Sequence, residues 1–155
     1  MLVALLALAA LGCGRAGGAG AQALQPFERE TLAIVSDGNE HRFTVEIART
    51  PAQQSQGLMF RKRMAADAGM LFLHDPPRRA MMWMKNTFIP LDMVFIASDG
   101  RIDQIVQRTT PQSLQNIVSD NPVRAVLELN GGTAARLGFR PGDRIVHPAF
   151  GAPPG

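Results

Sequence analysis

Polar side chains interrupt a strongly apolar part of the chain, the segment 83–93. Asp92 stands inside an apolar run, and a basic residue, an amide and a hydroxyl come shortly before it. An aromatic wall combined with a few polar groups suits the binding of a saccharide or a peptide. The predicted ligand-binding set, drawn from this segment and from two distant ones, comprises Arg61, Trp83, Lys85, Asn86, Thr87, Asp92 and Glu128.

Asp92 also has a structural interpretation. In that interpretation its carboxylate accepts backbone N–H groups of its own loop and pairs with Lys85 or Arg61, which pins the hairpin. An unpaired charge is costly to bury, so a single Asp in an apolar run is generally satisfied by its neighbours. The sequence favours this structural role for Asp92, and the binding role stays open.

Asp92 and Glu128 would serve as acid and base in a hydrolase if the fold brought them together. No spacing in the sequence shows that they meet. The chain has neither a Ser-centred nucleophile elbow nor a phosphate-binding loop, and His41, His74 and His147 lack a two-ligand metal spacing. We therefore expect no cofactor, and a hydrolase is the second hypothesis.

Seven methionines lie between positions 59 and 93. Thioether sulfur is a soft ligand for Cu(I). Met82, Met84 and the nearby His74 would form such a site if 80–84 were a strand, because alternate residues of a strand share a face. Methionine is also a common filler of irregular cores, and this favours packing over metal binding.

The charge balance excludes a dedicated nucleic-acid binder. The chain has 155 residues with 16 Lys and Arg against 13 Asp and Glu, a formal net charge of +3, whereas nucleic-acid binders show a strong basic surplus. Its dense basic spots are Arg61–Arg63 and Arg78–Arg79. Such spots can contact anionic lipid or an envelope polymer. The small surplus of positive charge favours the interpretation that they are solvated loop ends.

The beginning of the chain resembles an export signal. Leu2–Leu11 is apolar and too short to span a bilayer, and Ala21-Gln22-Ala23 offers a cleavage site. We expect a signal peptide over 1–23, one domain over 24–150 and a flexible tail over 151–155. Lipidation of Cys13 is the alternative. Both place the protein in the periplasm or elsewhere outside the bacterial cytoplasm, with no transmembrane segment in the mature chain.

Local patterns predict a domain built mainly of strands. Alternating residues and an Asp37-Gly38 turn predict a hairpin over 28–47. A capping box of Thr50 and Gln53 predicts a short helix that ends at Gly57.

Further elements follow along the chain. We expect short strands at 70–73, 80–84, 91–97, 101–107, 125–129 and 143–146, and a helical turn at 133–137. About seven short strands and two short helices in one chain predict an α+β, mainly β fold, a small, partly closed barrel or sandwich.

A series of ordered motifs resembles the DUF192 family of small bacterial and archaeal proteins. The motifs are Gly57–Arg61, Gly69–Phe72, Trp83–Met93, Val126–Gly132 and Pro141–Asp143. The resemblance covers residues 43–147 and implies a mainly β fold, with no established activity, substrate or cofactor. Met82 departs from it, because the family more often has an aromatic residue before the tryptophan.

The first functional hypothesis is an exported, non-catalytic binding or accessory module of the bacterial cell envelope that binds a small polar ligand or an envelope component. The second is the hydrolase acting on an envelope polymer. The third is a structural protein-interaction domain whose motifs specify only the fold.

Overall fold

The computed structural model describes residues 24–151, and its first two strands form a long hairpin. Strands β1 (Glu28–Ser36) and β2 (Asn39–Ala48) pair antiparallel across the turn. Asp37 and Gly38 both have positive φ, 47° and 78°, the conformation that matches the right-handed twist of a hairpin. The predicted hairpin is confirmed. The expected signal peptide, with Cys13, lies outside the described residues, as do positions 152–155 of the expected tail.

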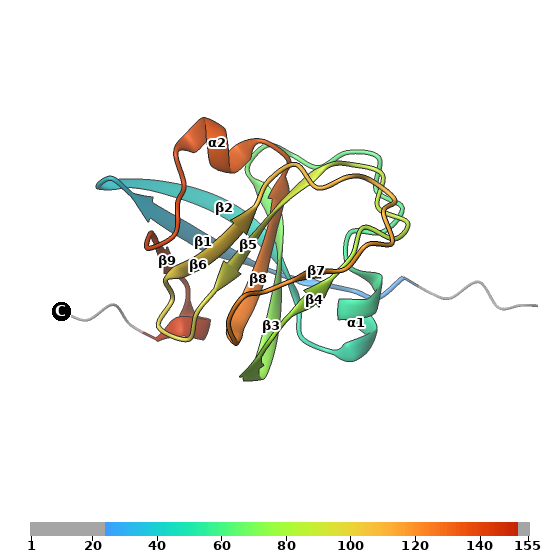
Figure 1. Ribbon diagram of the computed structural model, residues 1–155, viewed down its shortest axis with the longest axis horizontal. Coiled ribbons are helices and arrows are strands. Elements are labelled where there is room, and N and C mark those ends of the chain that lie inside the picture. Colours follow the sequence, from blue (N-terminus) through green and yellow to red (C-terminus); the bar gives the residue numbers. More distant parts are fainter. Residues whose placement is uncertain (1–23, 152–155) are drawn as a thin grey trace, which may run out of the picture.

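Seven strands form one curled sheet (Figure 1), in the order β6-β5-β8-β3-β2-β1-β9. The strands that follow the hairpin are β3 (Ala68–Arg78), β5 (Leu91–Ile96), β6 (Ile102–Val106), β8 (Val123–Asn130) and β9 (Arg144–Val146). Neighbours pair antiparallel except β2 and β3, which are parallel. A parallel pair needs a crossover connection, and the chain between residues 49 and 67 supplies it.

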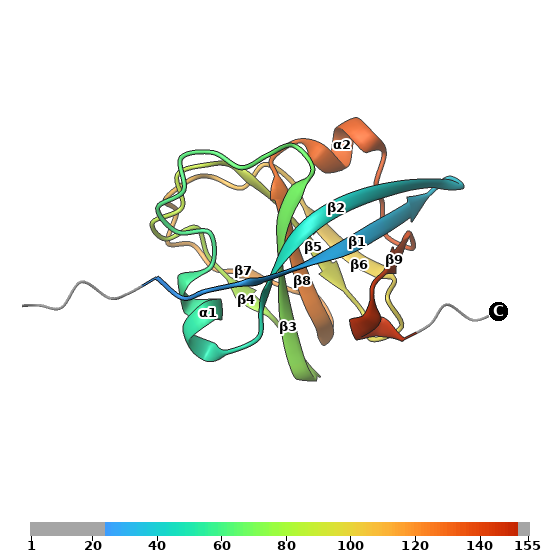
Figure 2. The same cartoon turned by 180° about the vertical axis from the view of Figure 1, so that it is seen from behind.

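The two edges of the sheet meet at one end, so the barrel is partly closed. Arg101 and Arg144 form a bridge between the edges. Ile102 donates its N–H to the carbonyl of Asp143, and Ile145 donates to Gly100, both at 2.8 Å. The reverse view in Figure 2 shows the hairpin crossing the molecule in front of the other strands. The predicted mainly β, partly closed barrel is confirmed.

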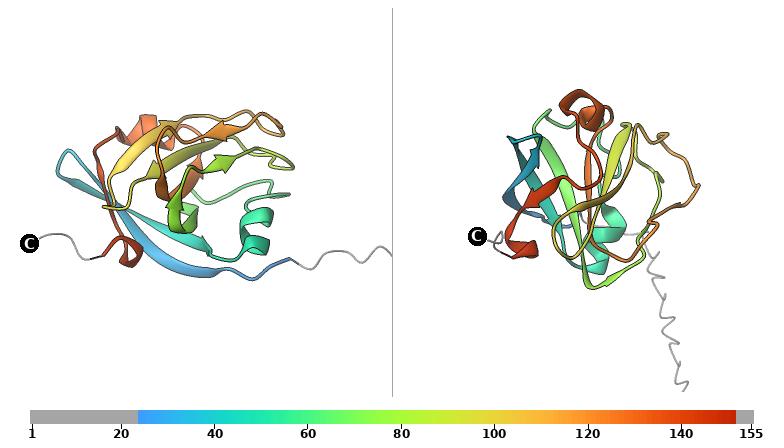
Figure 3. Two further views of the ribbon diagram at one scale, coloured as in Figure 1. Left: turned by 60° about the horizontal axis from the view of Figure 1, so that its bottom comes forward. Right: turned by 60° about the vertical axis from the view of Figure 1, so that its left-hand side comes forward.

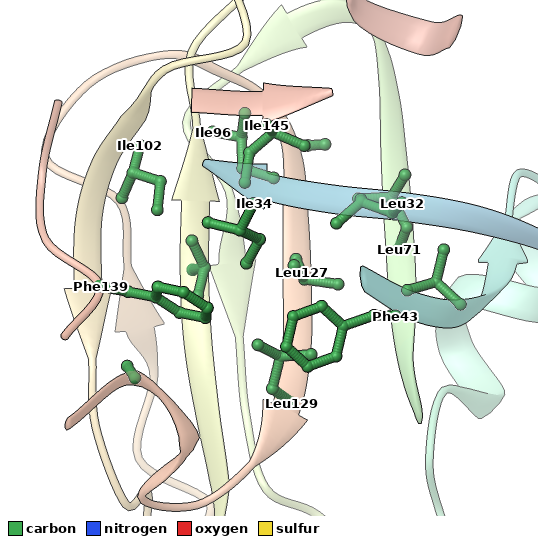
Figure 4. Close-up of a cluster of buried hydrophobic side chains, with 14 of the residues drawn as sticks. Leu32, Ile34, Phe43, Leu71, Ile96, Ile102, Leu127, Leu129, Phe139 and Ile145 are labelled. Carbon is green, nitrogen blue, oxygen red and sulfur yellow. The ribbon is translucent and has the colours of Figure 1, made fainter. Parts of the chain in front are cut away.

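The inner face of the curled sheet holds the larger hydrophobic core (Figure 4). Phe43 and Phe139 meet edge to face, with ring centroids 6.2 Å apart. The other buried side chains come from every strand of the sheet and from the segment between β8 and β9, among them Leu32, Ile34, Leu71, Ile96, Ile102, Leu127, Leu129 and Ile145. Residues of one parity in each strand therefore line the inside of the barrel.

A layer of irregular chain covers part of the outer face. Three segments, 57–66, 79–90 and 110–118, form this layer, which we call the outer layer. Within it, β4 (Met81–Met82) and β7 (Ile117–Val118) make a separate two-stranded sheet. The second core lies between the outer layer and the sheet, and its members include Leu58, Met70, Phe72, Met84, Met93, Phe95 and Val126.

The strand expected over 80–84 was too long. It ends at Met82, because the chain then turns and Met84 donates its N–H to the carbonyl of Ser113 at 3.1 Å. Strand β7 was not predicted, since its two residues carry no repeating pattern.

Both predicted helices are present. Helix α1 (Pro51–Gln56) has the complete capping box, in which the Thr50 hydroxyl accepts the N–H of Gln53 and the Gln53 side chain accepts the N–H of Thr50. Helix α2 (Thr133–Leu137) ends at Gly138, whose φ is 75°. Over residues 24–151, no helix has the length and apolar composition needed to cross a bilayer.

Candidate functional site

Glu128 is the carboxyl group that the fold buries on the outer face of the sheet. It lies in β8 opposite Met70 of β3 on one side and Met93 of β5 on the other. The residue is only 4% exposed. Burial raises the pKa of its carboxyl from 4.5 to about 8, because removing a carboxylate from water disfavours its charged form. Glu128 is therefore mostly neutral at pH 7.

A pocket of about 430 Å³ lies over this carboxyl group, between α1, β3, β8 and the outer layer. Its apolar walls come from Leu58, Met59, Phe72, Met81, Met82 and Trp83. Most of its exposed surface is apolar, and its polar side chains are Gln54, Ser55, Gln56, His74, Arg78, Lys85, Thr87, Asn116 and Glu128. A mostly apolar concavity with a few convergent polar groups is the usual form of a small-molecule site.

His74 is the second buried titratable group of the pocket. Its Nδ1 lies 3.4 Å from a guanidinium nitrogen of Arg78, and its Nε2 has no hydrogen-bond partner within residues 24–151. Burial, followed by the charges of Arg78 and Arg124, lowers the pKa of His74 from 6.5 to about 4. The imidazole is therefore neutral at pH 7 and retains one free polar atom.

The structure brings four of the seven predicted ligand-binding residues to this pocket. Trp83, Lys85, Thr87 and Glu128 all line it. The Lys85 ammonium lies 5.1 Å from the centroid of the Trp83 ring, within the range of a cation–π contact. The buried Thr87 hydroxyl donates to the carbonyl of Lys85 at 3.2 Å. These residues place a charged and an aromatic group in the walls.

Asn86 and Arg61 lie outside the pocket lining. Asn86 has φ 54° and its carbonyl accepts the N–H of Phe60 at 2.8 Å, so it joins two segments of the outer layer. Arg61 pairs with Glu46 of β2 and lies 6.0 Å from the ring centroid of Phe27. Both residues hold parts of the fold together beside the pocket.

Asp92 is fully buried on the inner face of the sheet, away from the pocket. Its Oδ1 accepts the backbone N–H groups of Arg108 at 2.8 Å and Gly132 at 2.9 Å. Its Oδ2 accepts the N–H of Ala134 at 2.8 Å. The carboxylate thus joins the start of α2 to the loop after β6.

The donors to Asp92 differ from those expected. We predicted N–H groups of its own loop and a pair with Lys85 or Arg61. The actual donors lie 16 to 42 residues further along the chain, because Asp92 points to the inside of the barrel, where α2 begins.

The hydrolase hypothesis based on Asp92 and Glu128 is wrong in this fold. Asp92 pairs in register with Leu129, and Glu128 pairs with Met93. Side chains of successive strand residues point to opposite faces of a sheet, so the two carboxyl groups lie on different sides of it. They cannot act as acid and base on one bond.

The methionines divide between the pocket and the second core. Met82 and His74 line the pocket, together with Met59 and Met81. Met84 is fully buried, and its sulfur lies 3.1 Å from the hydroxyl of Thr109. The expected common face of Met82 and Met84 is therefore not formed. In the described part of the chain, no group of three or more His, Cys, Asp and Glu is arranged to hold a metal ion.

Sequence reasoning missed the contribution of α1 to the pocket. Gln54 lines it and donates its side-chain N–H groups to the carbonyls of Ala48 at 3.3 Å and Leu73 at 2.7 Å. Phe72, Arg78 and Asn116 were also not predicted. One usable signal was the sequence PAQQSQ, a helix without a buried face, because a helix of this kind can offer amide side chains to a ligand.

Two solved structures are similar to this chain. One is a protein of unknown function from Novosphingobium aromaticivorans, 41% identical over 77% of this chain and 85% of that one, with a TM-score of 0.75. The other, from Sinorhizobium meliloti, is described as a putative transcription regulator. It is 48% identical over 82% of this chain and 99% of that one, with a TM-score of 0.79. A comparison with curated proteins found no match.

The family assignment rests on a match over most of the domain. The model of DUF192, described as an uncharacterised ACR, matches residues 33–147. The match begins within β1 and ends directly after β9, so it includes the other strands of the sheet and the outer layer. It also extends the resemblance read from the sequence motifs by ten residues, from position 43 to position 33. The chain belongs to the DUF192 family.

Proposed function

We propose that this protein is an exported binding module of the bacterial cell envelope, and that its ligand occupies the pocket over Glu128. The observation that carries the proposal is a carboxyl group buried at the wall of a 430 Å³ pocket, with burial as the cause of its raised pKa. A fold gains nothing in stability from burying a lone carboxyl group. Such a group is therefore a candidate for ligand recognition.

The chemistry of the buried part of the pocket favours uncharged polar groups with an apolar neighbour. A neutral carboxyl group donates one O–H and accepts at its other oxygen. Glu128 and the free Nε2 of His74 thus offer hydrogen bonds from the buried part of the pocket. Phe72, Met82 and Trp83 offer apolar surface. Saccharide hydroxyls and peptide amides fit this combination, which supports a peptidoglycan fragment or a short peptide as the ligand.

The proposed location depends on residues outside the described part of the chain. The apolar run 2–11 and the Ala21-Gln22-Ala23 site support export with cleavage after Ala23. Lipid attachment at Cys13 is the competing outcome. The mass of the protein purified from bacterial envelope fractions distinguishes these outcomes, and an intact chain in the cytoplasm contradicts both.

A thermal-shift screen tests the binding proposal. The protein is heated with peptidoglycan fragments, oligosaccharides and short peptides, each over a series of rising concentrations up to about 100 times the dissociation constant of any ligand that binds. A bound ligand at this concentration adds about 2.7 kcal/mol and raises the melting temperature by several degrees.

Variants then connect any shift to the pocket. Glu128→Leu keeps a side chain of similar size but removes the carboxyl group that would bond to the ligand, so we expect it to abolish the shift while the variant stays folded. Glu28→Leu makes the same change at an exposed position of β1 and should leave the shift unchanged. A flat screen, or a shift that persists in Glu128→Leu, contradicts the proposal.

A further inference from the structure

The exposed large apolar side chains gather in the outer layer. Seven such residues occur within 24–151, and six of them belong to the three segments of this layer: Phe60, Met81, Trp83, Phe88, Leu114 and Val118. Phe60 and Leu114 are among the most exposed, at 59% and 69%. A concentration of exposed apolar groups in one region marks an interaction surface.

The same segments carry positive charge only. Residues 57–66, 79–90 and 110–118 contain five Lys and Arg, namely Arg61, Lys62, Arg63, Arg79 and Lys85, and no Asp or Glu. Because the whole chain has 16 basic and 13 acidic side chains, the remainder carries 11 basic and 13 acidic ones. The outer layer is therefore the basic part of a molecule whose other parts have a small acidic surplus.

Four of these five cations are available to a partner. Arg61 is held by Glu46. Lys62, Arg63, Arg79 and Lys85 are exposed and form no ion pair with any other residue of the described part. Two of the exposed apolar residues stand close to these cations in the sequence, because Phe60 directly precedes Arg61–Arg63 and Trp83 is two positions before Lys85.

Hydrogen bonds and ring contacts hold the three segments together as one surface. Phe60 and Phe88 meet edge to face at 6.2 Å. Gln112 donates its N–H to the carbonyl of Thr87 at 3.0 Å. Met81 and Val118 are register partners in the β4–β7 pair. The apolar groups are thus exposed on a fixed layer.

The described chain begins at the same end of the molecule as the outer layer. In Figure 1 both lie to the right, while the described chain ends on the left, and the tilted view at the left of Figure 3 shows the same arrangement. A segment of 23 residues precedes Leu24. An anchor in that segment would therefore hold the end of the molecule that carries the outer layer close to the membrane.

We propose that the outer layer docks on an anionic lipid surface, with its aromatic side chains at the level of the headgroups. Aromatic rings favour the interface between headgroups and acyl chains, and Lys and Arg close to an anionic leaflet each add favourable binding. Interleaved aromatic and basic residues are the pattern of interfacial binding. The surface needs no ligand in the pocket, so it stands independently of the proposed function.

Trp83 provides a local probe of docking, because it is the single tryptophan of the chain. The full-length protein is mixed with vesicles of phosphatidylglycerol and phosphatidylcholine. We expect the Trp83 emission to shift to shorter wavelength and to be quenched by brominated lipid. Neutral phosphatidylcholine vesicles should give a much weaker response, as should anionic vesicles in 0.5 M salt. A response caused by insertion of the N-terminal segment alone would be unchanged in variants of the outer layer.

Variants separate this surface from the pocket. Lys62, Arg63, Phe88 and Leu114 are exposed and do not line the pocket. Lys62→Glu with Arg63→Glu, and separately Phe88→Ser with Leu114→Ser, should each weaken the Trp83 response to anionic vesicles at least tenfold. Arg42→Glu with Arg136→Glu makes the same charge change outside the outer layer and should have much less effect.

Three outcomes overturn the proposal. One is the absence of a Trp83 response to anionic vesicles, and another is an equal response to neutral ones. The third is a Trp83 shift that appears without lipid as the protein concentration rises. That result would make the outer layer a contact between copies of this chain.

Discussion

Asp92 and Glu128 lie on opposite faces of the sheet, although their strands are direct neighbours. Asp92 is opposite Leu129 in register and Glu128 is opposite Met93. The inner carboxylate accepts three backbone N–H groups. The outer carboxyl group has burial as the cause of its altered pKa. The two residues belong to successive pairs of the β5–β8 ladder. In one pair the carboxylate holds the fold together, and in the next the carboxyl group faces a pocket.

Replacing Asp92 should destabilise the fold without altering the pocket. Asp92→Asn removes the charge and turns an N–H group toward one of the three N–H donors, and buried polar groups without partners are costly. We expect a loss of about 3 kcal/mol in the free energy of unfolding, measured by urea denaturation. Asp120→Asn, at an exposed position, is the control and should change the free energy of unfolding by less than about 0.5 kcal/mol. An equally small change in Asp92→Asn would contradict the structural role.

The raised pKa of Glu128 predicts a stability that falls with rising pH. The unfolded chain loses this proton near pH 4.5, whereas the folded protein keeps it until about pH 8. Between these values the folded state binds more protons, so the free energy of unfolding contributed by Glu128 decreases by about 1.4 kcal/mol per pH unit. Glu128→Gln should remove this slope. Denaturation of both proteins at pH 5 to 8 checks it, and parallel curves would refute it.

The lowered pKa of His74 predicts the opposite dependence in acid. The unfolded chain binds a proton near pH 6.5, whereas the folded imidazole stays neutral down to about pH 4. Stability contributed by His74 is therefore present above pH 6.5 and is lost as the pH falls toward 4. His74→Gln should be less sensitive than the wild type over this interval. Unfolding followed by circular dichroism at pH 4 to 7 measures the difference, and an unchanged acid sensitivity excludes His74 as its source.

The cap of α1 should matter to both the fold and the pocket. Thr50→Ala removes the hydroxyl that accepts the N–H of Gln53, and the loss of an N-cap costs about 1 kcal/mol. Because α1 carries Gln54 to the pocket, ligand affinity should fall as well. Chemical denaturation and ligand titration measure the two effects. Thr110→Ala, an exposed change in the outer layer, serves as the comparison and should show neither.

Local signals predicted most of the elements. The Asp37-Gly38 turn, the Thr50–Gln53 capping box and the apolar run 91–96 each act over a few residues, so they can be read without knowing what packs against them. The strand expected through Met84 was too long, because a turn held by the distant Ser113 ends it. That bond joins residues 29 positions apart and leaves no local pattern.

The candidate site was predicted only in part, again because contacts between distant residues leave no local pattern in the sequence. The motif 83–93 contained three pocket residues. It also contained Asp92, which points to the inside of the barrel and away from the pocket. Sequence spacing showed the alternation along each strand. It did not show which parity of β5 and of β8 would face outward together, since that depends on the register between strands whose paired residues lie 29 to 39 positions apart.

The sequence by itself determined the family, the mainly β class, the turns, the caps and the set of polar residues from which a site could be built. These follow from local backbone preferences and from ordered motifs. Only the tertiary structure decided which carboxyl group is buried without a charged partner and which is bound by backbone N–H groups. It also decided that the exposed aromatic and basic side chains of three distant segments form one surface. Burial, register and pKa depend on neighbours that the chain brings together only when it folds.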